Sequence, residues 1–200
     1  MAALAAAALR AASRPLTGLS LLDDCRWQRE GPAARQVREG ADVNAVGSDG
    51  ISPLMLALWA GDDATTRHGL SDGFVLTLLA AGADVHARDS FGFTPLVYAG
   101  ASGRSAAARL LVERGADLNH ANAGGDSALT LACHKGHEDL ALWLLGAGAD
   151  VGQRNSAHKT ALDYCEAMRY PRAAKELRAR GALTGEEMAA AEETGARKAE

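Results

Sequence analysis

Asp89-Ser90-Phe91-Gly92-Phe93-Thr94-Pro95-Leu96 decides the fold, because its last three residues recur in phase along the chain. Copies of this marker read Ser52-Pro53-Leu54, Ser127-Ala128-Leu129 and Thr160-Ala161-Leu162. The four copies begin at residues 52, 94, 127 and 160, so the intervals between them are 42, 33 and 33 residues. A second marker, Gly-Ala-Asp, begins at residues 40, 82, 115 and 148 and has the same intervals. Two independent markers in one phase predict a repeat array.

Each 33-residue unit reads as two short helices. Thr94 is suited to cap the first helix and Pro95 to begin it, since the missing N–H of proline is harmless there. Gly103 is placed to end that helix. The second helix ends at Gly115 and carries on one face Ala107, Leu110 and Leu111. Because two short helices cannot bury their apolar faces alone, we predict that like units stack on one another.

These residues resemble the ankyrin repeat, whose signature begins D-x-x-G-x-T-P-L-H-x-A-A and ends G-A-D-V-N. Residues 89–96 and 82–85 match it closely, and the resemblance covers roughly residues 19–182. It implies an all-α repeat solenoid with β-hairpin-like turns, built from three central repeats and two degenerate capping repeats. We expect an Ala-rich extension at residues 1–18, a repeat domain of about five units at 19–183, and a charged, mobile tail at 184–200.

The two terminal units carry polar residues where the central units are apolar. In the first unit these are Asp23, Asp24, Arg35 and Gln36, and in the last unit they are Asp163, Glu166, Lys175 and Arg178. Terminal repeats need a polar outer face, so we predict that these residues face water. Beyond the last unit, Thr184-Gly185-Glu186-Glu187 reads as a capping box that starts a short Ala/Glu helix.

The 42-residue interval contains nine extra residues. Aligning Phe74 and Val75 with Leu140 and Ala141 leaves residues 62–70 unmatched, between the two helices of the second unit. Insertions in a repeat map to exposed loops and often lie at a binding face. A tolerated surface extension is the alternative, because lengthening a loop costs little free energy.

Composition excludes several classes of protein. The chain has 200 residues, a formal charge of −4 and 48% hydrophobic residues, so disorder and a basic nucleic-acid-binding face are both disfavoured. No stretch is long and apolar enough to span a membrane. Three cysteines are too few for a disulfide framework and favour reduced thiols. We therefore expect a cytoplasmic monomer. Residues 1–18 contain Arg10 and Arg14 and no acidic residue, as organellar transit peptides do, so an organellar location is an alternative. A nuclear location is a further alternative.

No catalytic or metal-binding constellation emerges. The densest polar cluster is Cys133-His134-Lys135-Gly136-His137, but Gly136 breaks the helix between Cys133 and His137, and no second ligand pair lies at finger spacing. Burial is predicted for both cysteines. Cys133 falls in phase with Leu58 and Gly100 inside the first helix, and Cys165 falls at a position that is alanine in the other units. We expect no enzyme activity, no cofactor and no metal.

The resemblance places partner contacts on the concave face formed by the hairpin tips and the first helices. Carried over by phase, and with the insertion added, the predicted partner-binding residues are Ile51, Trp59, Arg67, His68, Ser90, Phe91, Phe93, His134 and Lys135. Aromatic residues form only 4% of the chain, yet three of them fall at these predicted exposed positions: Trp59, Phe91 and Phe93. Aromatic side chains often anchor interfaces, which favours a binding role for them. The alternative is that they pack on neighbouring hairpins. Phe74, Trp143 and Tyr164 are predicted to be packing residues.

These patterns indicate a non-enzymatic protein-interaction module, an adaptor or regulatory protein whose partner is another protein. The alternative is a regulatory or inhibitory subunit of an enzyme complex that uses the 62–70 loop, with Arg67 and His68, to block a site. The fold is a neutral scaffold for such functions, so the partner follows from the non-repeating residues alone.

Overall fold

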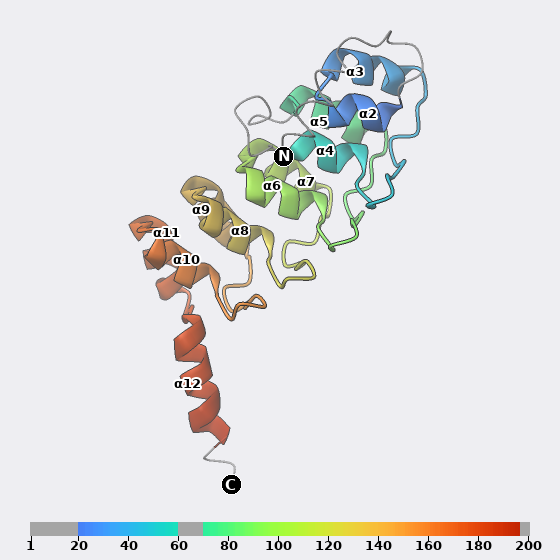
Figure 1. The fold of residues 1–200 in the computed structure, drawn as a ribbon. Coiled ribbons are helices and arrows are strands. Elements are labelled where there is room, and N and C mark those ends of the chain that lie inside the picture. The colour runs from blue at the N-terminus through green and yellow to red at the C-terminus, as the bar shows by residue number, and fades with distance from the viewer. Residues whose placement is uncertain (1–19, 60–69, 197–200) are drawn as a thin grey trace, which may run out of the picture.

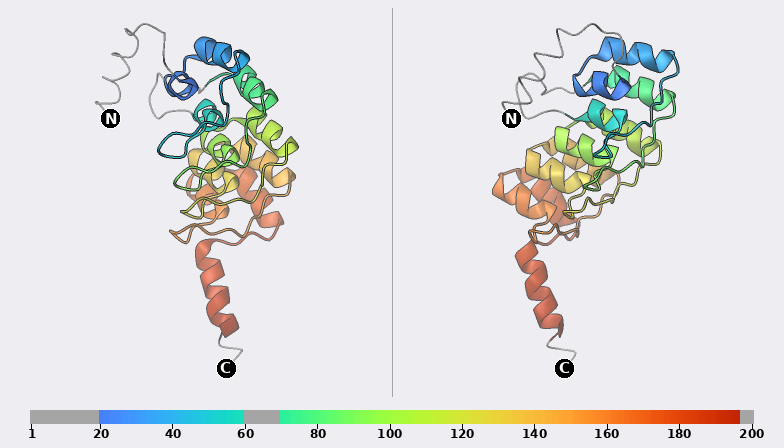
Figure 2. Two further views of the ribbon diagram at one scale, coloured as in Figure 1. Left: turned by 90° about the vertical axis from the view of Figure 1, so that its right-hand side faces the viewer. Right: turned by 45° about the vertical axis from the view of Figure 1, so that its right-hand side comes forward.

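A computed structural model describes residues 20–59 and 70–196 of the chain. These residues form eleven helices and no strand. The helices are paired and stacked, and the loops between successive pairs lie along one edge of the stack (Figures 1 and 2). The predicted all-α repeat solenoid is therefore confirmed.

Five helical pairs make up the stack. They are α2 (Leu21–Arg26) with α3 (Glu30–Arg38), α4 (Pro53–Leu58) with α5 (Asp72–Ala80), α6 (Pro95–Ser102) with α7 (Ser105–Glu113), α8 (Ala128–Lys135) with α9 (Glu138–Gly146), and α10 (Ala161–Ala167) with α11 (Pro171–Ala179). A further helix, α12 (Gly185–Ala196), extends away from the stack (Figure 1). We number the pairs as units one to five.

The recurring Ser or Thr caps the first helix of units two to five. Its hydroxyl oxygen accepts a hydrogen bond from the backbone N–H three residues later, at 3.3–3.4 Å, and the four capping residues are Ser52, Thr94, Ser127 and Thr160. Gly103 and Gly136 follow α6 and α8 with φ of 68° and 88°. These caps satisfy backbone groups at both helix ends, as the sequence pattern predicts.

A continuous apolar core runs through the stack. The leucine of the Ser/Thr marker is buried in every unit that carries it: Leu54, Leu96, Leu129 and Leu162. One leucine at an equivalent position of each second helix in units two to five is also buried: Leu78, Leu111, Leu144 and Leu177. Cys133, Cys165 and Phe74 are buried as predicted. The phase read from the sequence is therefore confirmed.

Backbone hydrogen bonds join each loop to the next one. The N–H groups of Ser90, Ala123 and Ser156 donate to the carbonyl oxygens of Asp49, Phe91 and Gly124 at 2.9, 2.9 and 2.7 Å. These three bonds occupy equivalent positions at successive junctions. A lone antiparallel bridge pairs Ala121 with Ser127 within one loop. The loops therefore form a linked edge rather than independent turns.

The turn glycines allow this close approach of the loops. Gly92 and Gly125 have φ of 76° and 80°, a conformation that favours glycine. A Cβ added to Gly125 would lie 2.8 Å from the Cα of Asn155 in the next loop. A side chain at this turn would thus be strained in conformation and would also collide with the neighbouring unit.

The first unit corrects one prediction. Asp24 was expected to face water, but it is buried, with 1% of its surface exposed. Its carboxylate forms an ion pair with Arg29 and accepts a hydrogen bond from the amide of Gln36. A buried charge requires such compensation, and the turn into α3 places a guanidinium beside it. The first unit therefore buries a polar cluster between its own helices.

The end of the inserted stretch that the structure describes packs against the repeat. Leu70, the last of the predicted inserted residues 62–70, is buried, and its N–H donates to the carbonyl of Ala57 at 3.1 Å. Ser71 then caps α5, at the position that His137 has before α9. Residues 62–69, with Arg67 and His68, and residues 1–18 lie outside the described residues.

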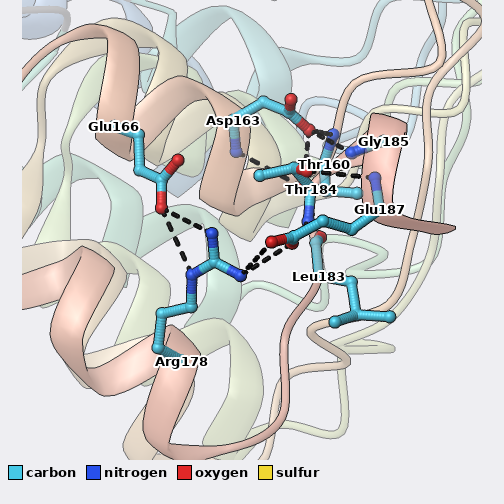
Figure 3. A network of polar contacts seen from close by, with 8 residues as sticks. All are labelled: Thr160, Asp163, Glu166, Arg178, Leu183, Thr184, Gly185 and Glu187. Atoms are coloured by element: carbon cyan, nitrogen blue, oxygen red, sulfur yellow. Dashed lines mark hydrogen bonds and ion pairs between the residues drawn. The ribbon is translucent and has the colours of Figure 1, made fainter.

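A polar network attaches α12 to the last unit (Figure 3). The Arg178 guanidinium donates to Glu166 at 3.0 and 3.2 Å and to Glu187 at 2.7 and 2.9 Å. Thr184 and Glu187 form the predicted capping box, because the Thr184 N–H donates to the Glu187 carboxylate at 2.7 Å and the Glu187 N–H donates to the Thr184 hydroxyl at 3.2 Å. The predicted Ala/Glu helix is thus present and begins at an ion-paired cap.

Asp163 holds the start of α12 against α10. One carboxylate oxygen accepts from the N–H and hydroxyl of Thr160 and from the N–H of Gly185, each at 2.8 Å. These hydrogen bonds and the nearby Lys159 lower the pKa of Asp163 against the opposing effect of desolvation by burial. A Cβ on Gly185 would collide with the carbonyl oxygen of His158. The first turn of α12 therefore lies directly on the last loop.

The buried seam predicts a large effect of shortening Leu144. Leu144→Ala should lower the free energy of unfolding by about 2–5 kcal/mol, because a cavity is left between α9 and its neighbours. Leu76→Ala, at an exposed residue of α5, is the control and should change it by about 0.5 kcal/mol or less. Urea unfolding followed by circular dichroism measures both. Equal effects would contradict the assigned core.

The loop contacts predict different costs for two glycine substitutions. Gly115 has φ of 87° and open space around its Cβ position, so Gly115→Ala should cost about 1–2 kcal/mol for conformation alone. Gly125→Ala should cost about 1–3 kcal/mol more, because the methyl group also displaces the next loop. Parallel urea titrations measure the difference. A Gly125→Ala protein as stable as the Gly115→Ala protein would show that the loops do not pack tightly.

Candidate interaction surface

Large apolar side chains are exposed mainly on units two and three. Phe91 is 67% exposed, Val46 57% and Trp59 48%. Trp59 and Phe91 were both predicted to be exposed. We call these three residues the apolar patch. They come from the loop before α4, from the end of α4 and from the loop before α6.

The position of Trp59 follows from the way α4 ends. Trp59 is the C-cap residue of this helix; its N–H still donates to the carbonyl of Met55 at 2.9 Å, and its ψ of 116° turns the chain away from the helix. The backbone is thereby fixed, while about half of the side-chain surface remains in water. Trp59 thus stands at the edge of the 60–69 segment.

Asp89 builds the turn that carries Phe91. One oxygen of its carboxylate accepts from the N–H groups of Phe91 and Phe93 at 2.9 and 2.8 Å, and the other accepts from the hydroxyl of Tyr98 at 2.7 Å. The carboxylate is itself buried. Phe91 therefore projects from a turn whose backbone is held by a carboxylate on the inner side.

Phe93 differs from Phe91 in its surroundings. Its ring contacts the ring of Tyr98, with centroids 5.3 Å apart and planes tilted by 45°. Phe93 is half-buried as a result. The prediction of an exposed aromatic thus fits Phe91, whereas Phe93 packs within its own unit and not on a neighbouring hairpin, as the alternative had it. Among the described residues, no ring–ring contact joins Trp59 to Phe91 or Phe93.

Ile51 and Ser90 take part in holding the loops. Ile51 is half-buried against the core, and its N–H donates to the side chain of Asp49 at 3.3 Å. The hydroxyl of Ser90 donates to the backbone carbonyl of Asp49 at 2.7 Å. Asp49 also forms a solvent-exposed ion pair with Arg26 at 3.4 Å. Asp49, Arg26 and Ser90 thus form a polar border beside the loops that carry Val46 and Phe91.

His134 and Lys135 lie apart from the apolar patch, at the end of α8. Both are exposed, and the His134 ring stacks on Tyr164 of the next unit at 4.5 Å. The Tyr164 hydroxyl in turn accepts from the Asn155 amide at 2.9 Å. The sequence analysis assigned these two residues to the unit after the one that carries Phe91, and the structure places them there.

Two of the three thiols, those of Cys25 and Cys133, are poor nucleophiles. Burial and the adjacent Asp24 carboxylate raise the pKa of Cys25 to about 12. A hydrogen bond to Cys165, together with burial, raises the pKa of Cys133. The thiolate is the reactive form, so both groups are poor nucleophiles. In the described ranges, no three His, Cys, Asp or Glu side chains are grouped to hold a metal ion.

Val46 was missed by sequence reasoning. It lies in the loop before α4, at the position that Arg88, Ala121 and Arg154 occupy in later units. A large apolar residue where the later units have arginine or alanine is a signal that the sequence does contain. It could have been found by comparing loop positions rather than helix positions alone.

Residues 63–155 match the family model of ankyrin repeats in three copies. The matched span contains the turn that carries Phe91, whereas Val46 and Trp59 lie before it. No curated protein matches the chain. Of the helices in residues 20–59 and 70–196, none has the length and apolar character needed to cross a bilayer.

The Asp89 turn predicts a specific alkaline transition. Burial and the hydrogen bond to Asp89 raise the pKa of Tyr98 above its ordinary value of 10.0. The folded protein thus keeps a proton that the unfolded chain loses, so this stabilisation is complete below pH 10 and decreases as the pH rises above it. Tyr98→Phe should remove that component of the pH dependence. Urea unfolding between pH 8 and about pH 11 tests this, and an unchanged slope in the variant would contradict it.

Proposed function

Because this chain is an ankyrin-repeat protein, we propose that it is a non-enzymatic adaptor or regulatory module that binds another protein through the apolar patch on units two and three. Ankyrin repeats generally mediate protein–protein interaction. The choice of this surface rests on one observation, the exposure of Trp59 and Phe91 on neighbouring units.

The energetic argument starts from the area of the two aromatic side chains. Aromatic side chains bury about 150–250 Å² when fully covered. With 48% of Trp59 and 67% of Phe91 exposed, covering each one removes on the order of 100 Å² from water. At about 25 cal/mol per Å², each contributes roughly 2–3 kcal/mol to association. Two such anchors on a chain poor in aromatic residues favour a binding role.

Preorganisation supports the same choice. Phe91 follows a turn held by Asp89, and its carbonyl is bonded to the N–H of Ala123 in the next loop. The backbone of Trp59 is held by α4. Binding a partner therefore requires little ordering of the backbone, and ordering is a major cost of association. Asp49, Arg26 and Ser90 provide the polar border that specific interfaces place around an apolar centre.

The second candidate is a regulatory or inhibitory subunit of an enzyme complex that uses the 62–70 loop. The observation that favours it is the place of the segment in the chain. Residues 60–69 directly follow Trp59, and the chain returns to the repeat at buried Leu70. Residues Arg67 and His68 would then act next to the apolar patch. The two candidates share a surface and differ in what the partner does.

Removing the two anchors should abolish binding without unfolding the repeat. Trp59→Ala and Phe91→Ala should each weaken association by about 2 kcal/mol, or roughly thirtyfold, as buried aromatic anchors do. Affinity purification of the tagged full chain from its host, followed by titration of the recovered partner against purified variants, measures this. Met168→Ala is the matched control, because Met168 is an exposed apolar residue on unit five.

Two outcomes would reject the proposal. If either variant loses several kcal/mol of unfolding free energy, the side chain is part of the core and not an anchor. If both variants keep the partner and Met168→Ala loses it, the binding surface lies on unit five. Arg67→Ala and His68→Ala separate the two candidate functions, since only the second predicts that these variants lose an effect on the partner's enzymatic activity.

A further inference from the structure

Two of the three cysteines meet at the junction between units four and five. Cys133 belongs to α8 and Cys165 to α10, and their exposed fractions are 1% and 0%. The two thiols are hydrogen-bonded to each other. The third cysteine, Cys25, is buried in α2 of unit one. The core between units four and five therefore contains a pair of reduced thiols in contact.

The repeat itself does not require sulfur at either position. Units two to four have alanine at the position of Cys165, and units two and three have Leu58 and Gly100 at the position of Cys133. The stack thus packs with ordinary apolar residues at these places. The contact between two thiols is a feature of this one junction.

The first helices of successive units are close enough to be bridged by short side chains. At the preceding junction, a Cβ on Gly100 would lie 2.8 Å from the Cα of Ala128. In place of that glycine, α8 carries Cys133, whose side chain lies between α8 and α10 and reaches Cys165. A disulfide requires Cα atoms roughly 4.4–6.8 Å apart, a separation that suits short side chains meeting between adjacent helices.

A hollow in unit five leads toward the pair. Its volume is about 330 Å³, and it is formed by α10, α11 and the turn between them. The residues that line it are Cys165, Glu166, Arg169, Tyr170, Pro171 and Ala174. Because Cys165 itself has no exposed surface, only a small molecule that enters the wall of this hollow can reach its sulfur, and the reaction should be slow.

The hydrogen bond between the thiols makes them chemically unequal. It lowers the pKa of Cys165, against the opposing effects of burial and of the carboxylates of Glu138 and Glu166. The same hydrogen bond, together with burial, raises the pKa of Cys133. Since the thiolate is the reactive form, Cys165 is the member of the pair that reacts first, and it is also the one that lines the hollow.

We propose that Cys133 and Cys165 are a redox-sensitive pair, which a small peroxide converts into a disulfide between units four and five. In the first step, the Cys165 sulfur attacks one peroxide oxygen and the O–O bond breaks, which gives a sulfenic acid at Cys165 and one water. In the second step, the Cys133 sulfur attacks the Cys165 sulfur and the S–O bond breaks. The hydroxide that leaves takes the Cys133 proton and becomes a second water. The two sulfurs together lose two electrons, which reduce the peroxide.

The disulfide would tie the last unit of the array to its only neighbouring unit. A terminal repeat is held by one interface, whereas a central repeat is held by two. A covalent link between α8 and α10 restricts the separation of unit five from unit four. The pair lies apart from the apolar patch, because α8 and α10 belong to units four and five of the stack (Figure 1).

Peptide mapping of the oxidised full chain tests the proposal. The folded protein is treated with hydrogen peroxide, remaining thiols are blocked with N-ethylmaleimide in urea, and the unreduced tryptic peptides are analysed by mass spectrometry. We expect peptide Gly115–Lys135 joined to peptide Thr160–Arg169, with the loss of two hydrogen atoms. Dithiothreitol should separate them, and Cys25 should carry the maleimide.

Two variants and one solvent condition serve as controls. Cys25→Ser should give the same joined peptides. Cys133→Ser keeps a hydroxyl that can donate to Cys165 but cannot form the disulfide, so dimedone should trap a sulfenic acid at Cys165. Oxidation in urea should also produce pairs that contain Cys25, because the unfolded chain does not select between thiols. Circular dichroism shows whether each variant is folded.

Three results would overturn the proposal. The first is the absence of the joined peptides from the oxidised folded protein. The second is their formation in urea alone, which would mean that the folded core does not bring the sulfurs together. The third is a disulfide in the folded protein that contains Cys25 or that links two chains.

Discussion

Contact between successive units is the interaction on which the rest of the structure depends. Each unit has two helices of nine residues or fewer, a length at which an isolated helix is marginal in water. The first helices approach so closely that a Cβ on Gly100 would lie 2.6 Å from the carbonyl oxygen of Ala128. The conformation of any loop, including the one that carries Phe91, is therefore a property of the stack rather than of its own unit.

The repeated features could be predicted from the sequence. Period, helix caps and buried leucines follow from spacing, because the same physical requirement recurs in each unit and is expressed four times over. Thr94, Leu129 and Cys165 have the predicted cap or buried positions for this reason. The exposure of Trp59 and Phe91 could be predicted from the same phase. Both residues fall at the non-repeating positions that the resemblance places on the concave face.

The features that occur once were harder to predict. Asp24 is buried because a single arginine, Arg29, neutralises it, and the described residues of the other units contain no such buried pair to reveal the pattern. Phe91 and Phe93 differ only in whether a ring of the same unit lies beside them, which depends on the direction of the side chains. Information that does not repeat must come from tertiary contacts.

The helix α12 covers the C-terminal end of the array of loops. The hydrogen-bonded edge of loops is terminated by α12, since Gly185 lies on the carbonyl of His158 and Glu192 reaches back to Arg154 at 2.6 Å. A self-similar chain with both edges free would accept copies of itself head to tail and grow into a filament. At the C-terminal edge, the first turn of α12 lies on the side of the last loop from which such a copy would approach.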